Sequence, residues 1–227
     1  MDPKDLWDHS EKGTTVMRSR FMIPDIIQSG WTDSAGLLGE FSSSSYCQKM
    51  LDLYGKIRIG ELYQSEIHGA GHIERVILLG AVLAWKEALQ NLETSMLLAA
   101  CAYHDIGRID DGLDREHGLR SARKMESIGL LEDFPDIPDK VHPVLYAAVA
   151  SHCIHAEDQP KMIELFGVKD YQMPRFSLVS SLLNSADRLD RVRLGDLDPV
   201  HLECDSARNL VDFAEELYQE YSGWKIH

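Results

Sequence analysis

The sequence predicts an all-α protein organised around one large domain. Apolar residues recur at helical spacing along most of the chain after residue 45, whereas the strict alternation typical of strands is scarce. The length of 227 residues favours one large domain, or one domain with a small appendage. A content of 44% hydrophobic and 26% charged residues is typical of a globular protein with a sizeable core.

Residues 1–45 are predicted to form an irregular N-terminal extension. The stretch 30–45 is rich in Gly and Ser, a composition typical of a loop or linker. Residues 46–227 are therefore expected to form the domain proper, with its core at about 65–195.

Periodicity and capping signals divide the domain into seven predicted helices. A serine or aspartate favours a helix start, and a glycine favours a helix end. The segment 93–105 is apolar on nearly all sides and is predicted to be a central helix. The seven predicted segments are 46–59, 72–89, 93–105, 114–128, 143–152, 177–193, and 205 or 206 to about 221.

The formal net charge of −14 opposes non-specific attraction to nucleic acids and to anionic membranes. No apolar run approaches the roughly 20 residues of a membrane span, and no signal peptide is visible at the N-terminus. The four cysteines are far apart and form no CxxC pair, so we expect free thiols in a cytoplasmic protein, with Cys101 and Cys153 used for packing.

Histidine and aspartate are concentrated in a few segments of the predicted domain. Side by side on a helix, His104 and Asp105 would point about 100° apart, so one cation can bind both only at a helix end. Neutral imidazole and carboxylate are ligands that suit Zn, Mn or Fe. One such ion would take four side chains from three segments, leaving positions open for water. These are His72 in GHIERV, His104 and Asp105 in AYHDIGR, and Asp187 in SADRLDRV.

Three of these segments resemble the sequence blocks of the HD-domain superfamily of metal-dependent phosphohydrolases. They are HIERV, LLAACAYHDIGR and SADRLDRVR, in the family's order, and the resemblance covers roughly residues 65–195. The resemblance implies an HD-domain helical bundle, here with N- and C-terminal helical extensions. It also identifies the four side chains above as the signature ligands.

Family members with two metal ions add two histidines between the HD pair and the last aspartate, and His117 and His152 stand in that interval. Asp105 would then bridge the ions. His117 falls in the predicted first turn of its helix, where the positive end of the dipole keeps an imidazole neutral. The cofactor is expected to be one or two divalent ions per chain, with Mn, Zn, Fe, Mg, Co and Ni all open.

The activity implied by the resemblance is hydrolysis of a phosphate mono- or diester by metal-activated water. The substrate would be a nucleotide or another small phosphorylated metabolite. Asp105, Arg108 and Arg188 are the expected catalytic residues, since the arginine fork matches phosphate oxygens. Further candidates to bind phosphate or orient imidazoles are Arg75, Arg120, Lys124, Glu74, Asp110 and Asp111.

Two rival functions remain open at this stage: an HD-fold di-iron oxygenase with the same ligand order, and a non-catalytic nucleotide-binding signalling module. His68 is expected at the pocket mouth or in a structural role, because Gly69 and Gly71 interrupt a helix that would join it to His72. His155 is a loop candidate for the site. No nucleic-acid or membrane partner is expected, and a homodimer is left open. The arginines at 191 and 193 are expected on a solvated helix face.

Overall fold

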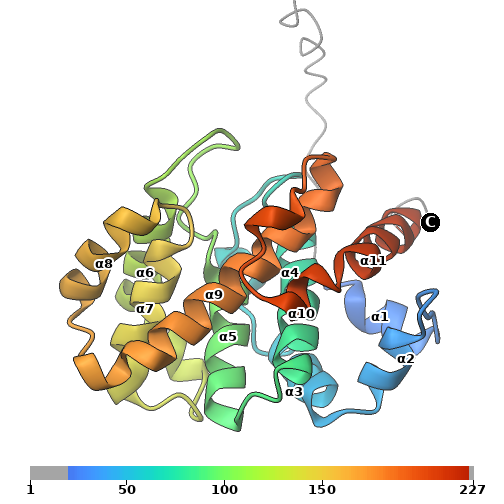
Figure 1. Ribbon diagram of the computed structural model, residues 1–227, viewed down its shortest axis with the longest axis horizontal. Coiled ribbons are helices and arrows are strands. Elements are labelled where there is room, and N and C mark those ends of the chain that lie inside the picture. The colour runs from blue at the N-terminus through green and yellow to red at the C-terminus, as the bar shows by residue number, and fades with distance from the viewer. Residues whose placement is uncertain (1–19, 225–227) are drawn as a thin grey trace, which may run out of the picture.

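The computed structural model describes residues 20–224, and its regular structure within that range is entirely helical, which confirms the all-α prediction (Figure 1). The eleven α-helices are α1 (Ile23–Gln28), α2 (Leu37–Ser42), α3 (Ser45–Tyr54), α4 (Ala70–Lys86), α5 (Asn91–Tyr103), α6 (His117–Ser127), α7 (His142–Ser151), α8 (Gln159–Phe166), α9 (Met173–Leu189), α10 (Asp205–Arg208) and α11 (Val211–Trp224). Short 3-10 helices lie between them, at η2 (Ile59–Glu61), η3 (Leu130–Asp133), η4 (Asp139–Val141), η5 (Ala156–Asp158), η6 (Asp170–Gln172), η7 (Asp190–Leu194) and η8 (Pro199–His201).

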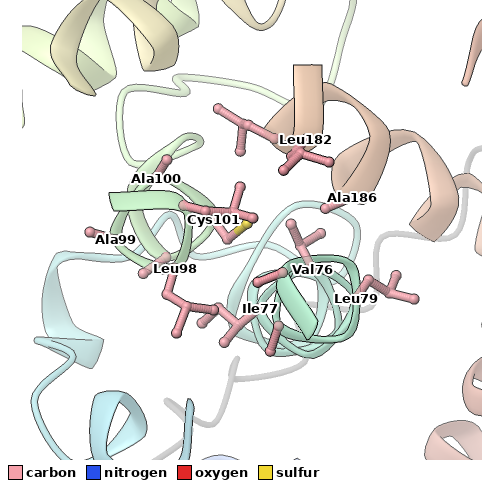
Figure 2. Packing of buried hydrophobic residues seen from close by; sticks show 14 of the residues in the cluster. Val76, Ile77, Leu79, Leu98, Ala99, Ala100, Cys101, Leu182 and Ala186 are labelled. Carbon is pink, nitrogen blue, oxygen red and sulfur yellow. The ribbon is translucent and has the colours of Figure 1, made fainter. Parts of the chain in front are cut away.

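The core lies where α4, α5 and α9 cross (Figures 1 and 2). Helix α5 is buried from Thr94 to Tyr103, as expected for a central helix. A Cβ placed on Gly80 of α4 would lie 2.7 Å from Cys101 Sγ on α5 and 3.8 Å from Ala186 Cβ on α9. The three helices therefore approach each other most closely at a position that only glycine fills without displacement.

Helix α4 ends at Lys86, three residues before its predicted end. Ala88 has a φ of +50°, the left-handed conformation that usually ends a helix at glycine. The amide of Leu89 donates to the carbonyl of Ala84 at 2.9 Å, which closes the last turn. The helix therefore ends next to a left-handed alanine, where the sequence has no glycine to predict the end.

The prediction of an irregular N-terminal extension is wrong for residues 20–45, while residues 1–19 lie outside the described range. Helices α1 and α2 bury Ile23 and Phe41 in the common core. The carboxylate of Glu74 on α4 accepts hydrogen bonds from the amides of Met22 at 2.5 Å and Ile23 at 2.9 Å, and from the Tyr221 hydroxyl. Glu74 therefore ties both ends of the described chain to α4, in place of the predicted role of orienting an imidazole.

Three further helix predictions need correction. The segment expected as one helix from 205 to 221 is divided into α10 and α11. Helix α8 was not predicted, and α9 begins at Met173 and continues as the 3-10 helix η7. No helix among residues 20–224 has both the length and the apolar character needed to cross a bilayer.

Candidate metal centre

All six predicted metal ligands lie in the first or last turn of a helix or directly after its last residue. They are His72 in α4, His104 and Asp105 after α5, His117 in α6, His152 after α7, and Asp187 in α9. Five helices thus deliver their ends to one region, and the adjacent His104 and Asp105 meet it where the helix stops.

The contact between the end of α5 and the start of α6 depends on Gly107. A Cβ placed there would lie 2.2 Å from the Ser121 amide nitrogen and 2.7 Å from the His117 carbonyl oxygen. The Gly107 amide donates to Ser121 Oγ at 2.8 Å. This close approach brings the carboxylate of Asp105 beside the first turn of α6.

The first group of ligand atoms comes from α4, α5 and α9. The Nε2 atoms of His72 and His104 lie 3.2 Å apart, and Asp187 Oδ1 lies 3.3 and 3.6 Å from them. Asp105 Oδ2 lies 3.6 and 3.8 Å from the same two nitrogens. Neighbouring ligand atoms around an ion with bonds near 2.1 Å are about 3 to 3.4 Å apart, so small shifts would close this group on one cation.

The second group joins α6 and α7 to the same carboxylate. His117 Nε2 lies 2.8 Å from His152 Nε2 and 3.1 Å from Asp105 Oδ1, and His152 Nε2 lies 3.7 Å from that oxygen. Oδ2 of Asp105 faces the first group and Oδ1 faces the second. The carboxylate therefore has the position of a bridge between two ions.

Three of the four imidazoles donate their outer nitrogen, Nδ1, to a backbone carbonyl. For His104 and His152 that carbonyl is three residues earlier, in the last turn of the helix, where carbonyls lack helical partners. The acceptors are Cys101 for His104 at 3.0 Å, Val149 for His152 at 2.6 Å, and Asp114 for His117. Because a carbonyl can only accept, Nδ1 carries a proton in each of these rings, and the neutral form of each ring presents an Nε2 lone pair to the cluster.

His72 obtains the same orientation from Asp190, which the sequence analysis missed. Asp190 Oδ2 accepts from His72 Nδ1 at 2.8 Å, and the carboxylate also binds Arg75 at 2.6 and 2.9 Å. Arg75 is 3% exposed, so the prediction that it contacts phosphate is wrong. Arg193 also binds this carboxylate, at 3.1 Å, and its side chain is buried rather than solvated.

Two carboxylates lie among the imidazoles of the cluster, one buried and one at the cavity. Around the buried carboxylate of Asp105, Arg108 Nε lies 2.9 Å from Oδ2 and His117 Nε2 lies 3.1 Å from Oδ1. Burial raises the pKa of Asp105, but the surrounding imidazoles outweigh it and hold that pKa well below its usual range. The same balance lowers the pKa of Asp187. The buried carboxylate of Asp105 and the half-buried carboxylate of Asp187, both facing imidazole nitrogens, fit a divalent cation.

The pKa of His117 also shows that the cluster favours a positive charge beside Asp105. Burial lowers this pKa, but hydrogen bonding to Asp105 and Cys153 outweighs burial and raises it to about 10. The expectation that the helix dipole keeps this imidazole neutral is therefore wrong in the absence of a cation, because the nearby carboxylate of Asp105 favours a second proton on His117.

A cavity of about 750 Å³ opens onto the cluster and exposes His117, His152 and Asp187 at its floor. Two of the expected phosphate-binding residues, Arg108 and Arg188, line it. Arg191 lines it as well, and its side chain is exposed, as expected for a solvated helix face.

Two other predicted phosphate contacts are engaged elsewhere. Arg120 donates to the Gly107 carbonyl at 2.9 Å and binds Asp114, and Lys124 donates to the Glu61 carbonyl at 2.9 Å. Neither residue lines the cavity. Both predictions are wrong, because these side chains hold the ends of helices together.

His68 lines the cavity beside the cluster without joining either ligand group. Asp111 Oδ1 accepts from His68 Nδ1 at 3.0 Å and from Ser65 Oγ at 2.6 Å. Burial lowers the pKa of His68 to about 4, although the hydrogen bond to Asp111 acts in the opposite direction. Asp111 thus orients an imidazole, as predicted, but this imidazole is His68. Asp110 accepts from the Gly112 amide in a turn.

The remaining candidates are Cys153 and His155. Cys153 lines the cavity, and its sulfur and the ligand atoms of His117 and His152 lie within 4.8 Å of one another. Its thiol donates to the Arg115 carbonyl at 3.2 Å, so its role exceeds the predicted packing. His155 contacts Arg115 and does not line the cavity.

Comparisons of the chain with protein-family models, with curated proteins and with solved structures found no match.

Proposed function

We propose that the protein is a metal-dependent phosphohydrolase acting on the phosphate ester of a small metabolite. The observation that carries this proposal is the convergence of four imidazole Nε2 atoms on the carboxylates of Asp105, which is buried, and Asp187, which lines an arginine-lined cavity. The order of these ligands along the chain, which resembles that of HD-domain phosphohydrolases, supports the same function.

The residues present fit two divalent ions. His72, His104 and Asp187 would hold one ion, His117 and His152 the other, and Asp105 both. Ions held there would supply Lewis acidity toward the phosphoryl oxygens and lower the pKa of a coordinated water.

The chain's own side chains then bind and orient the substrate. Arg108 and Arg188 would donate to phosphoryl oxygens with the planar fork of the guanidinium. Arg108 is also fixed beside the bridging carboxylate of Asp105. His68, with Nδ1 committed to Asp111, is a neutral ring whose Nε2 can accept a hydrogen bond from a hydroxyl or water in the cavity.

The decisive test joins metal content to turnover. Protein purified without chelator is analysed for metals, and phosphate release is measured on mono- and diesters with each divalent ion. Replacing the bridge, Asp105→Asn, removes the charge at nearly constant shape, so we expect loss of bound metal and turnover at background level. The matched control is Asp136→Asn, whose carboxylate pairs with Lys49 in a different pocket.

Turnover at the wild-type rate in Asp105→Asn would rule out the mechanism. Two irons per chain with substrate-dependent uptake of oxygen, and no phosphate release, would identify an oxygenase. Nucleotide binding without phosphate release under any metal would identify a signalling module.

A further inference from the structure

Exposed apolar side chains gather around the mouth of the cavity. Among residues 20–224, seven large apolar side chains are exposed, and five of them line the cavity or directly adjoin in sequence a residue that does. Single exposed leucines need no explanation, but a cluster around one opening indicates a binding surface. The five are Ile67, Ile109, Leu113, Leu194 and Val200.

The apolar residues that line the cavity come from two distant parts of the chain. Leu113, 91% exposed, belongs to the loop between α5 and α6, which also carries Ile109. Leu194 and the partly buried Leu197 follow α9 and line the same cavity as Leu113. The α5–α6 loop and the segment after α9 lie along the same edge of the bundle (Figure 1). An occupant of the cavity would therefore pass between leucines from two distant parts of the chain.

The acidic side chains at the mouth are already hydrogen-bonded within the protein. Asp196 pairs with Arg191, and Asp114 pairs with Arg120. A third carboxylate, that of Asp198, accepts from the backbone amide at the start of η8. Leu113 and Leu194 thus form the exposed apolar part of a mouth that also carries the exposed side chains of Arg191 and His201, while the imidazole–carboxylate cluster lies deeper.

The size of the cavity indicates an occupant larger than a phosphate group. A volume of about 750 Å³ lies within the range of roughly 300 to 1,000 Å³ typical of small-molecule sites. We infer, on the basis of the function proposed above, that the substrate is the phosphate ester of an apolar alcohol. Its phosphate lies on the cluster, and its apolar group lies between Leu113 and Leu194.

The test uses non-hydrolysable phosphonates, so that binding is measured apart from turnover. The metal-loaded full chain is titrated calorimetrically with methyl-, butyl-, hexyl- and phenylphosphonate. Affinity should rise by up to about threefold to fourfold per methylene as the chain is buried. The phenyl compound tells whether the apolar surface prefers a flat ring or a flexible chain.

A double variant and a control test whether Leu113 and Leu194 cause the dependence on chain length. Leu113→Ser with Leu194→Ser should abolish the dependence on chain length and leave the affinity for methylphosphonate unchanged. Both side chains are exposed, so the double variant should fold. The matched control, Tyr171→Ser, removes an exposed ring just before the opposite end of α9 and should retain the full dependence.

Metal-dependent binding of methylphosphonate with no gain for longer chains would overturn the inference while leaving the proposed function intact. An equal chain-length dependence in the double variant would overturn it too, because the effect would lie elsewhere. A wild-type dimer that the double variant dissociates, with no chain-length dependence, would assign the leucines to a second copy of the chain. Binding of no phosphonate at all would reject the inference, and the phosphate-release assay would still decide the function.

Discussion

Two regions that share helices α4, α5 and α9 differ in the kind of atoms they bring together. Where α4, α5 and α9 cross, Gly80, Cys101 and Ala186 meet in apolar contact, and burial raises the pKa of the Cys101 thiol. Near the ends of these helices, and of α6 and α7, imidazoles and carboxylates face one another around the buried Asp105. The crossing needs no further group, whereas the cluster could hold a cation. Stability and metal binding should therefore respond separately to substitutions in the two regions.

The largest effect is expected at Asp190, whose carboxylate both pairs with the buried Arg75 and orients His72. Asp190→Ala would leave the Arg75 guanidinium buried without its ion pair, at a cost of about 3 to 5 kcal/mol in the free energy of unfolding. It would also free the ring of His72, which should weaken metal binding by roughly 10- to 100-fold. Urea unfolding and metal titration measure the two effects.

Lys161→Ala, which removes an exposed pair with Asp158, is the control for the Asp190 variant and should cost less than about 1 kcal/mol. An Asp190 variant as stable as this control would show that Arg75 does not depend on its partner.

The next effect is a pH dependence confined to the cluster. In the metal-free protein His117, with its pKa raised to about 10, holds a proton that a metal ion must displace. Metal affinity should rise by about tenfold per pH unit for each displaced proton between pH 6.5 and 8.5. Calorimetry in buffers of different ionisation enthalpy would count the protons released, and a constant affinity would contradict the assignment.

The raised pKa of His117 also predicts how the stability of the protein changes with pH. A folded-state pKa above the unfolded value stabilises the metal-free protein fully below about pH 6.5, and this contribution is lost as the pH rises toward 10. Metal-loaded protein should not show this loss.

A smaller effect is expected at the helix crossing. Gly80→Ala places a methyl group 2.7 Å from Cys101 Sγ and should destabilise the protein by about 1 to 3 kcal/mol without changing metal affinity. Adding Cys101→Ala makes room for that methyl group. The double variant should therefore recover stability relative to the sum of the single variants in urea unfolding. Strict additivity would show that the two sites do not compete for space.

The smallest effect is a gain at the end of α4. Ala88→Gly relieves a left-handed alanine and should raise the free energy of unfolding by at most about 1 kcal/mol. The change lies far along α4 from His72, so metal affinity should stay constant. A loss of stability in thermal unfolding would show that the Ala88 methyl group contributes contacts worth more than the strain.

Apolar periodicity and terminal glycines predicted the helices in which the apolar pattern runs without a break. The uniformly apolar α5 and the glycine after the HD pair were enough to place the central helix and its end. Helix α8 was missed because it is a single short stretch with a proline in its first turn. The break between α10 and α11, like the early stop at Ala88, depends on packing that no local composition encodes.

The six candidate ligands were predicted from the resemblance of three segments to a known family and from the two histidines between them, and the structure brings all six together near helix ends. Asp190 was missed, since three residues beyond Asp187 it looks like another charge on a helix face among arginines. Its spacing of one turn was the available signal. Arg75 is buried because it binds Asp190, 115 residues further along the chain. Arg191 lies at the cavity, where it pairs with Asp196, five residues away. The sequence did not show which partner each arginine meets.

Gly107 limits how this pocket could be re-engineered. It supplies no functional group, yet even one methyl group there would part the two helix ends that share the Asp105 carboxylate. A combinatorial library aimed at new substrates can vary the residues that follow in the loop, but it should keep position 107 fixed. If a substitution there abolished metal binding, the changed spacing between the two ligand groups would explain it, and the residues at the mouth would not.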